Sequence, residues 1–330
     1  MSLLSEPGLT LTDDLQQHRA LIEQALAREG QILSTFSFIN LFAWQGHFRF
    51  DVERIGGALC IFAGNALGRF LYLPPLGGGL SGELIEECFR RMNPVNPGPG
   101  VSRIENVPLS QVALFPEDKF DRYLKGYDYL YARKDLVELK GNHYKSKRWA
   151  CNHFVKNTRY QYKPFEPGMA EEAMALYDAW AESRRRARDG DEAYAFMLEE
   201  NRDVYARVIT DARDLGLIGR AVFVNGRLKA TTFGYPLVPC ELTNRGLVLK
   251  ALAHRAQAHR VFCVLFEVAD LALTGLPALI FREFCADPLL KDYTWINAMD
   301  DSGMESLART KGSFHPACLA PSYTITQRGA

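Results

Sequence analysis

The segment from Lys140 to Lys163 gathers the side chains best suited to bind an anion. It contains seven lysine and arginine residues and no aspartate or glutamate, although the whole chain balances 39 basic against 39 acidic residues. Aromatic side chains are interleaved with these cations, and positive charge beside stacking surfaces suits a phosphate-bearing or nucleic-acid ligand. A solvated helix face is the alternative interpretation of such a charge run. The seven cations are Lys140, Lys145, Lys147, Arg148, Lys156, Arg159 and Lys163.

A helical wheel sorts this segment into two faces. The polar face carries Lys145, Arg148, Trp149, Asn152 and Lys156, and the apolar face carries Ala150, Cys151 and Phe154. Three cations on one face repel one another unless an anion, or carboxylates from elsewhere in the fold, lie beside them. The pattern therefore strengthens the prediction of an anionic ligand, and it leaves Lys147 nearer the apolar face.

Glu267 and Gly275 form a second candidate site. Glu267 follows a strongly apolar run that begins at Val261, and an unpaired buried carboxylate is costly, so we expect Glu267 to be either paired or functional. Gly275 opens the next predicted helix, whose free backbone N–H groups could accept a phosphate. One glycine at a helix start is weak evidence by itself.

The third candidate segment runs from Asp300 to Pro316. Asp300 and Asp301 stand where a predicted strand hands over to a helix, which favours capping as their role. His315 precedes a proline, so we expect an extended backbone that could direct the imidazole into a cleft; a structural hydrogen bond is the more common role of a lone histidine. Lys311 could contact an anion or a carbonyl group.

Alternating helices and strands must position these residues. Turn dipeptides and apolar patterns predict the following elements in the first part of the chain. They are a helix over Thr12–Arg28 capped by Thr12, strands over Phe48–Arg54, Ala58–Ala63 and Phe70–Leu73, a helix from Ser81 to Met92, no regular structure over Asn93–Gly100, and strands over Val101–Val107 and Tyr127–Ala132.

The second part repeats the alternation with longer helices. Asn225-Gly226 predicts a tight type I′ hairpin between the strands Leu217–Val224 and Arg227–Tyr235. The whole pattern predicts an α+β fold with a mixed, largely antiparallel sheet in each of two domains. The other predicted elements are helices over His143–Asn157, Met169–Arg188, Glu192–Thr210, Gly275–Cys285 and Gly303–Arg309, and strands over Arg159–Tyr162, Val261–Glu267, Tyr293–Ala298 and Leu319–Thr326.

Composition restricts the possible protein classes. A chain of 330 residues exceeds the usual size of one core, which predicts two domains, and 47% hydrophobic residues argue against long disorder. Seven scattered cysteines without a CxxC pair argue against a disulfide framework and a thiolate metal site, so no metal is expected. The sequence offers neither a signal peptide nor a stretch of ~20 apolar residues, and a cytoplasmic location is expected.

Motifs along nearly the whole chain resemble an uncharacterised bacterial family related to the C-terminal domain of phosphatidylglycerol lysyltransferases. Members of this family look like two tandem GNAT-type (acyl-CoA N-acyltransferase) domains. The motifs are Phe38-Ile39-Asn40-Leu41-Phe42-Ala43-Trp44; Tyr127-Asp128-Tyr129-Leu130-Tyr131 with Lys147-Arg148, Asn152 and Phe154; and Phe266-Glu267, Ala269-Asp270, Gly275-Leu276 and Lys311 through His315-Pro316.

The chain also departs from the family pattern. Trp149 stands where asparagine is expected, Val268 where lysine is usual, and Ala298-Met299 replace a polar pair. An insertion of roughly twenty residues falls between Tyr235 and Val261, in the region 236–260. Within it, Arg245-Gly246-Leu247 resembles the pyrophosphate loop of acetyltransferases but lacks the second glycine.

The resemblance implies domains at 1–132 and 133–330, with the active cleft in the second. It implies transfer of an acyl or aminoacyl group from acyl-CoA or aminoacyl-tRNA to a lipid head group, amine or hydroxyl. Such chemistry needs cations for the donor phosphates, a general base and an oxyanion stabiliser. The catalytic candidates are Glu267, His315 and Lys311, and the donor-binding candidates are Lys145, Lys147, Arg148, Asn152, Lys156 and Gly275.

Two other functions remain open at this point. A duplicated GNAT fold could bind an anionic ligand without turnover, which the departures at Val268 and Met299 favour. A small-molecule N-acetyltransferase is disfavoured by the missing glycine after Gly246. No tightly bound cofactor is expected; the expected partners are a phosphate-rich donor, with tRNA as one possibility, and a membrane contacted peripherally through a lipid acceptor.

Overall fold

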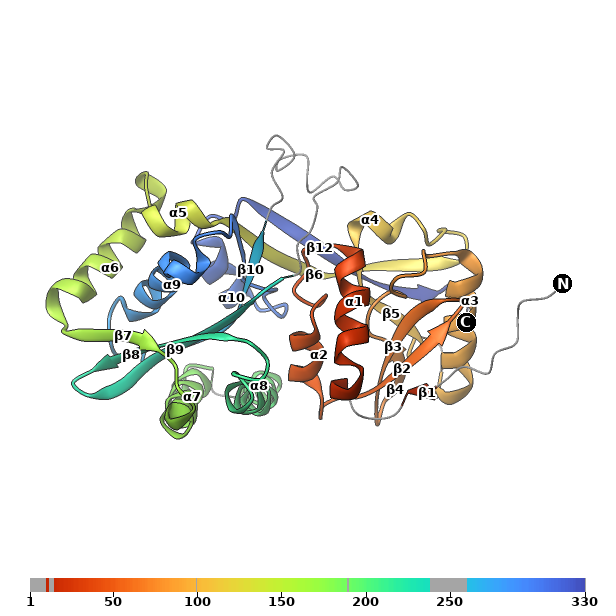
Figure 1. The fold of residues 1–330 in the computed structure, drawn as a ribbon, viewed down its shortest axis with the longest axis horizontal. Helices are drawn as coiled ribbons and strands as arrows, with labels where there is room; N and C mark the ends of the chain where they lie inside the picture. Colours follow the sequence, from red (N-terminus) through yellow and green to blue (C-terminus); the bar gives the residue numbers. More distant parts are fainter. Residues whose placement is uncertain (1–9, 12–14, 99, 189, 238–259, 330) are drawn as a thin grey trace. The chain divides into compact units, whose positions relative to one another are not determined.

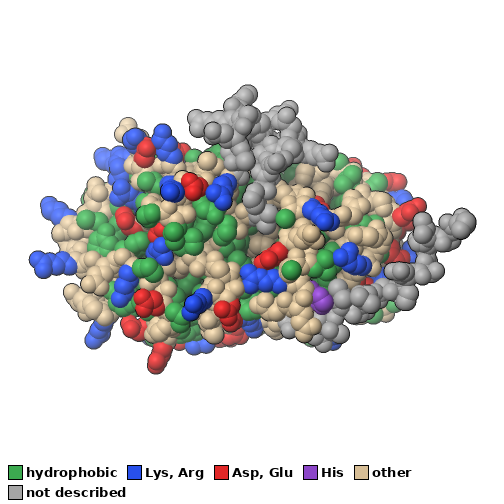
Figure 2. Space-filling view, viewed as in Figure 1, with side chains coloured by type: hydrophobic (Ala, Val, Ile, Leu, Met, Phe, Trp, Pro, Cys, Tyr) green, Lys and Arg blue, Asp and Glu red, His purple; other side chains and the backbone are tan. Residues whose placement is uncertain are grey.

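The chain forms two compact units. The computed structural model describes residues 10–11, 15–98, 100–188, 190–237 and 260–329 (Figure 1). Unit 1 contains the described residues up to Asp128 and from Leu319 onward, and unit 2 contains Tyr129–Leu237 and 260–318. The predicted Thr12 cap, the Arg245-Gly246-Leu247 motif and nearly all of the 236–260 insertion lie outside the described residues. Side chains of both charge signs are spread over the face seen in Figure 2, as the balanced composition leads one to expect.

Unit 1 is built on a largely antiparallel sheet. Its strands pair antiparallel except β4 and β5, which pair in parallel through Leu71 and Ile104. Positive φ angles at Gly56 and Gly57 close the predicted turn after the first long strand. In spatial order the strands are β1 (Thr10–Leu11), β2 (Arg49–Ile55), β3 (Ala58–Asn65), β4 (Gly68–Leu71), β5 (Arg103–Pro108) and β12 (Cys318–Gln327).

The helices of unit 1 begin at side-chain caps that the sequence only partly revealed. The predicted cap at Ser81 is confirmed, since its Oγ accepts the N–H of Leu84 at 3.2 Å. A second cap, Ser37, accepts the N–H of Asn40 at 3.0 Å and starts a helix that the sequence pattern did not predict. The helices are η1 (Leu15–His18), α1 (Arg19–Glu29), α2 (Phe38–Trp44), α3 (Gly82–Met92), η2 (Asn93–Val95) and α4 (Leu109–Val112).

Unit 2 repeats the strand arrangement of unit 1. An antiparallel meander is followed by one parallel pair, β10 with β11, and then by an antiparallel strand. The predicted tight hairpin is confirmed by φ angles of 51° at Asn225 and 75° at Gly226. The strands are, in spatial order, β7 (Tyr160–Pro164), β8 (Ile218–Val224), β9 (Arg227–Pro236), β10 (Val261–Ala269), β11 (Trp295–Asn297) and the second half of β6 (Phe120–Ala132).

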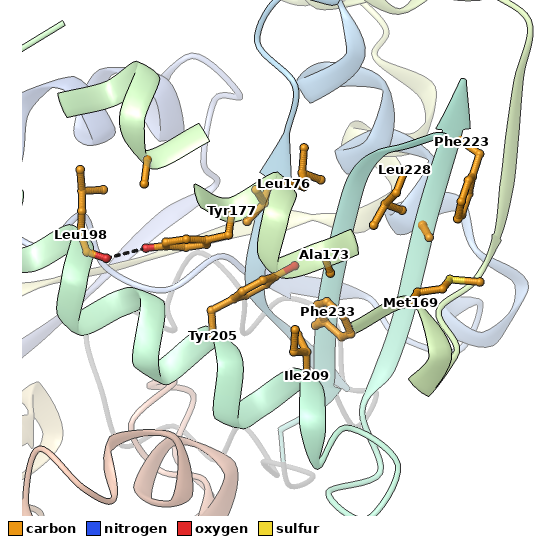
Figure 3. Close-up of a cluster of buried hydrophobic side chains, with 13 residues drawn as sticks. Met169, Ala173, Leu176, Tyr177, Leu198, Tyr205, Ile209, Phe223, Leu228 and Phe233 are labelled. Atoms are coloured by element: carbon orange, nitrogen blue, oxygen red, sulfur yellow. Dashed lines mark hydrogen bonds between the residues drawn. The ribbon is translucent and has the colours of Figure 1, made fainter. Parts of the chain in front are cut away.

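Helices cover both faces of the unit 2 sheet (Figure 1). α7 and α8 enclose one core, in which the Tyr177 hydroxyl donates to the carbonyl of Leu198 at 2.9 Å (Figure 3). Each large side chain buried there contributes about 1.5–3 kcal/mol. α5, α6 and α9 pack on the opposite face. The helices are α5 (Arg133–Glu138), η3 (Asn142–Tyr144), α6 (Lys145–Asn157), η4 (Pro167–Met169), α7 (Ala170–Arg186), α8 (Glu192–Thr210), α9 (Leu276–Ala286), η6 (Pro288–Leu290) and α10 (Glu305–Gly312).

The α+β class with largely antiparallel sheets is confirmed, but some local predictions were wrong. Asn93–Val95 forms a 3₁₀ turn, because Pro94 fits the first turn of a helix where its missing N–H costs nothing. β6 begins at Phe120 rather than Tyr127, since its polar first half carries no apolar alternation. The domain limits of 1–132 and 133–330 remain a proposal; residues 319–330 belong to unit 1.

Candidate active site in unit 2

The two parallel strands of unit 2 separate in the middle of the sheet. β10 and β11 pair only at Val261, Phe262 and Cys263, opposite Trp295–Asn297. Immediately afterwards, the register of β10 against β9 shifts between Val264 and Phe266, so Leu265 is the extra residue of a β-bulge. Bulges are frequent beside active sites, and parallel strands that part leave backbone groups available to a ligand.

Glu267 lies two residues beyond this bulge. Ala269, on the same face of β10, packs in a cluster with Phe154 of α6 and Leu276 of α9. The Oε2 atom of Glu267 is buried and has no hydrogen-bond partner in the described part of the chain. Burial raises the pKa of Glu267 to about 8, and Lys147 opposes that rise. The carboxyl group is therefore protonated at neutral pH and ready to exchange its proton slightly above it.

Lys147 turns toward this carboxyl group from the inner face of α6. Its inward direction follows the helical spacing it shares with the buried Cys151 and Phe154. Its Nζ lies 4.0 Å from the ring centroid of Phe314. Burial lowers the pKa of Lys147, while Cys151 and Glu267 raise it. Lys147 and Glu267 are coupled electrostatically, although no ion pair within 4.0 Å joins them in the described structure.

Lys311 holds the chain that follows β11. Its Nζ donates to the carbonyl of Ala298 at 2.6 Å and also to the carbonyl of Asp300. The sequence predicted that Lys311 contacts an anion or a carbonyl, and here the carbonyls belong to the backbone. The ammonium group thus fixes the turn after β11, and a direct contact with the reacting group remains a proposal.

Three tyrosine hydroxyls hold the segment between β11 and β12 in place by hydrogen bonds. No sequence pattern predicted these bonds. Tyr129 donates to Oδ2 of Asp301 at 2.6 Å, Tyr131 to the carbonyl of Lys311 at 2.9 Å, and Tyr144 to the carbonyl of Phe314 at 3.0 Å. Tyr129 and Tyr131 are two residues apart in β6 and therefore point to one face of the strand. This spacing is the sequence signal that they could hold the same segment.

His315 does not have the predicted extended backbone. Its φ of 54° is left-handed, because its N–H closes the end of α10 on the carbonyl of Gly312 at 2.9 Å. Its exposed ring meets the rings of His143 and Tyr144 edge-on, at centroid distances of 4.8 and 5.3 Å, and Nε2 lies 3.2 Å from the His143 carbonyl. The imidazole therefore lies beside Phe314, next to the Lys147 contact.

Strained backbone is concentrated around this segment. Met299 and Ser302 have φ angles of 60° and 51°, in addition to His315. Asp300 and Asp301 accept the N–H groups of Ser302 and Gly303, so they stabilise turns. They do not cap the helix as predicted, because the N-cap position of α10 is Met304. Such left-handed non-glycine residues persist only where surrounding bonds hold them, and they are frequent at functional sites.

The other predicted donor-binding residues of α6 do not gather around Glu267. Lys145, Asn152 and Lys156 are exposed on the outer face of the helix. Arg148 donates to the carbonyls of Leu139 and Gly141, the latter at 2.6 Å, and so fixes the preceding loop. The predicted cation stripe is therefore divided: the cation nearest Glu267 is the one that the wheel assigned to the apolar side.

Gly275 is explained by helix packing. Its φ is 91°, and a Cβ there would collide with the carbonyl oxygen of Ala150 in α6. The N–H of Leu276 donates to Leu273 at 3.1 Å, and Pro277 has no N–H. The start of α9 thus offers a phosphate few donors, and the predicted role of Gly275 remains a proposal.

The described residues offer neither a metal-binding cluster nor a membrane-spanning helix. They contain no group of three or more histidine, cysteine, aspartate or glutamate side chains placed to hold a metal ion. Nor do they contain a helix with the length and apolar character needed to cross a membrane.

Comparison with known proteins identifies the family. No curated protein matches the sequence. A conserved protein of unknown function from Bacteroides thetaiotaomicron has a similar structure, with a TM-score of 0.77, 23% identity and coverage of 96% of this chain and 99% of that chain. L-PGS from Bacillus licheniformis is also similar, with a TM-score of 0.60, 14% identity and coverage of 98% and 94%. The family model described as "Phosphatidylglycerol lysyltransferase, C-terminal" matches residues 28–326, and this chain therefore belongs to that family.

Proposed function

We propose that this protein transfers an acyl or aminoacyl group to a hydroxyl or amine, and that Glu267 is the proton acceptor. The observation that carries the proposal is the Oε2 atom of the half-buried Glu267, which is itself buried and has no hydrogen-bond partner among the described residues. It lies just past the point where two parallel strands part. The reaction would take place in the C-terminal domain, residues 133–330.

The chemistry of acyl transfer fits this arrangement. The acceptor attacks the donor carbonyl and must lose a proton, which an ionised Glu267 can take up. Lys147 favours the ionised form of Glu267 and can offset negative charge that develops nearby. Leu265, the extra residue of the bulge, leaves the strand ladder, and its backbone N–H is our candidate for the oxyanion donor. Phe314, Lys311 and His315 would line the same site.

Family membership supports a transferase-like function in general, and the substrates are a proposal. The name of the family refers to phosphatidylglycerol and to lysyl transfer. We therefore propose aminoacyl-tRNA as the first donor to test, with acyl-CoA as the second, and a lipid head group as the acceptor. A membrane would then be contacted through the acceptor.

Glu267→Gln tests the proposal because it keeps the shape of the side chain and removes its basicity. We expect turnover to fall about 10²–10⁴-fold, as for loss of a general base. In the wild type, kcat/KM should rise with pH up to about 8, the pKa of the carboxyl group. The assay combines purified protein, lysyl-tRNA or acetyl-CoA, and phosphatidylglycerol vesicles.

The matched control is Glu305→Gln, whose side chain is 85% exposed at the start of α10. It should retain full turnover. Unchanged turnover of Glu267→Gln would exclude Glu267 as the base.

A non-catalytic module that binds an anionic ligand is the alternative. The departures from the family pattern at Val268 and Met299 favour it. Thermal shifts with acyl-CoA or tRNA, without product from either donor, would support this alternative. A Lys147→Ala/Arg148→Ala variant that binds both ligands as the wild type does would exclude α6 from donor binding.

A further inference from the structure

The outer face of α6 is an exposed surface that the Glu267 site does not use. Trp149 is 59% exposed at the middle of this face. Lys145 lies one turn before it, and Asn152 and Lys156 lie one and two turns after it, all of them exposed. These four residues are called the α6 surface below. They point away from Cys151 and Phe154, which are buried on the inner face with Lys147.

The segment that carries the α6 surface has charge of one sign. No carboxylate occurs between Lys140 and Lys163, and the preceding Glu138 is paired with Lys140 at 2.8 Å. Lysine and arginine side chains project at the end of unit 2 where Figure 1 places α5, α6 and β7 (Figure 2). An anionic partner would therefore meet no repulsion from the segment itself.

We propose that the α6 surface docks on the surface of an anionic lipid bilayer. Exposed lysines on both sides of an exposed tryptophan combine the two kinds of side chain that favour an anionic bilayer surface. The lysines attract the lipid phosphates, and the indole leaves water for the head-group region. This inference goes beyond the proposed reaction and holds whichever group the protein transfers.

The geometry favours a lipid surface over a nucleic acid. One face of the Trp149 ring is already stacked on His153, at a centroid distance of 5.0 Å and an interplanar angle of 23°. Base stacking uses open aromatic faces inside a basic groove, whereas the α6 surface is the outward side of a helix. An indole with one face covered still offers its edge and other face to the head groups.

Vesicle co-sedimentation of the full chain tests the proposal. Vesicles of phosphatidylcholine alone are compared with vesicles that also contain phosphatidylserine or phosphatidylglycerol. We expect binding to both anionic vesicles and little to the neutral one. Lys145→Ala/Lys156→Ala should weaken partitioning about 25-fold, because each lysine near an anionic surface contributes roughly a factor of five. Added salt should weaken wild-type binding.

The control is Arg213→Ala/Lys291→Ala, which removes the same charge from exposed positions outside α6 and should bind as the wild type does. Equal partitioning of the two double variants would overturn the proposal. So would wild-type binding that requires the phosphatidylglycerol head group and not the negative charge it shares with phosphatidylserine, since such binding would belong to the acceptor site. Loss of tRNA binding without loss of vesicle binding would assign the α6 surface to nucleic acid.

Discussion

Each unit contains one pair of parallel strands that separate after a short stretch of pairing. The side chains that follow these two pairs differ in how they are hydrogen-bonded. In unit 1, β4 and β5 pair only through Leu71 and Ile104. Beyond them, Nδ2 of Asn106 donates to the Tyr72 carbonyl at 2.8 Å, and the Tyr72 hydroxyl donates to Asn40 at 2.6 Å. In unit 2 the corresponding place holds Glu267, whose buried oxygen has no such partner among the described residues. The same strand order thus gives one place closed by hydrogen bonds and one that holds an unpartnered carboxyl oxygen, so the fold alone does not decide function.

The two units also differ in how the carboxylate of a central strand is neutralised. Glu53 in β2 is 5% exposed and lies beside the guanidinium groups of Arg69 and Arg91, the latter at 2.7 Å. Glu267 has only Lys147 to offset its burial, and its pKa is raised to about 8. A neutralised carboxylate stabilises a fold, and an incompletely neutralised one is available for proton transfer.

Glu53→Gln should have the largest effect on stability. Removing one member of this charge network leaves Arg69 and Arg91 with their second carboxylate partners, at 3.6 and 2.8 Å, and costs about 1–3 kcal/mol. Transfer by the folded variant should be unchanged, because Glu53 lies in unit 1. Urea unfolding followed by circular dichroism measures the loss. Glu86→Gln, which breaks an exposed pair with Lys119, should cost much less, because solvent screens an exposed pair. Equal losses would remove the distinction between buried and exposed carboxylates.

Glu267→Gln should change how stability depends on pH. Because the folded pKa of about 8 lies above the ordinary 4.5, the folded protein binds the proton more tightly than the unfolded chain does. The contribution of Glu267 to the free energy of unfolding is therefore fully present below pH 4.5 and is lost as pH rises toward 8, by up to about 1.4 kcal/mol per pH unit. Glutamine cannot ionise, so the free energy of unfolding of the variant should rise relative to that of the wild type as pH increases from 4.5 to 8.

Unfolding curves at several pH values measure this difference. Glu305→Gln, altered at an exposed position, should follow the wild type throughout. If the Glu267→Gln curve also ran parallel to the wild type, Glu267 would resemble the neutralised Glu53, and the contrast between the units would disappear.

Local patterns predicted most of the elements, because their causes lie within a few residues. Asn225-Gly226 fixes its hairpin through φ angles, and Ser81 fixes its helix through one hydrogen bond. Glu267 was recognisable because a carboxylate in an apolar strand demands an explanation. In contrast, α2 was missed, since a seven-residue, mostly apolar segment is too short to show a helical period.

The arrangement of the site depended on partners far apart in the sequence. The wheel favoured the outer stripe of α6, whereas Lys147 is oriented by Phe314, which no local pattern connects to it. Likewise, His315 lost its predicted extended backbone to the bond that ends α10. The sequence therefore showed which residues could take part in a site. It did not show which of them lie near Glu267 and which only stabilise the fold.

The smallest expected effect compares Tyr72→Phe in unit 1 with Tyr144→Phe in unit 2. Each substitution removes one buried hydroxyl and one hydrogen bond, so each should cost about 1 kcal/mol of stability. Only Tyr144 holds Phe314, the residue that lies against Lys147. Tyr144→Phe should therefore also lower transfer turnover, by about tenfold, as expected when a reacting group is misplaced slightly. Equal turnover of the two variants would mean that the hydroxyl of Tyr144 only stabilises the fold, as that of Tyr72 does.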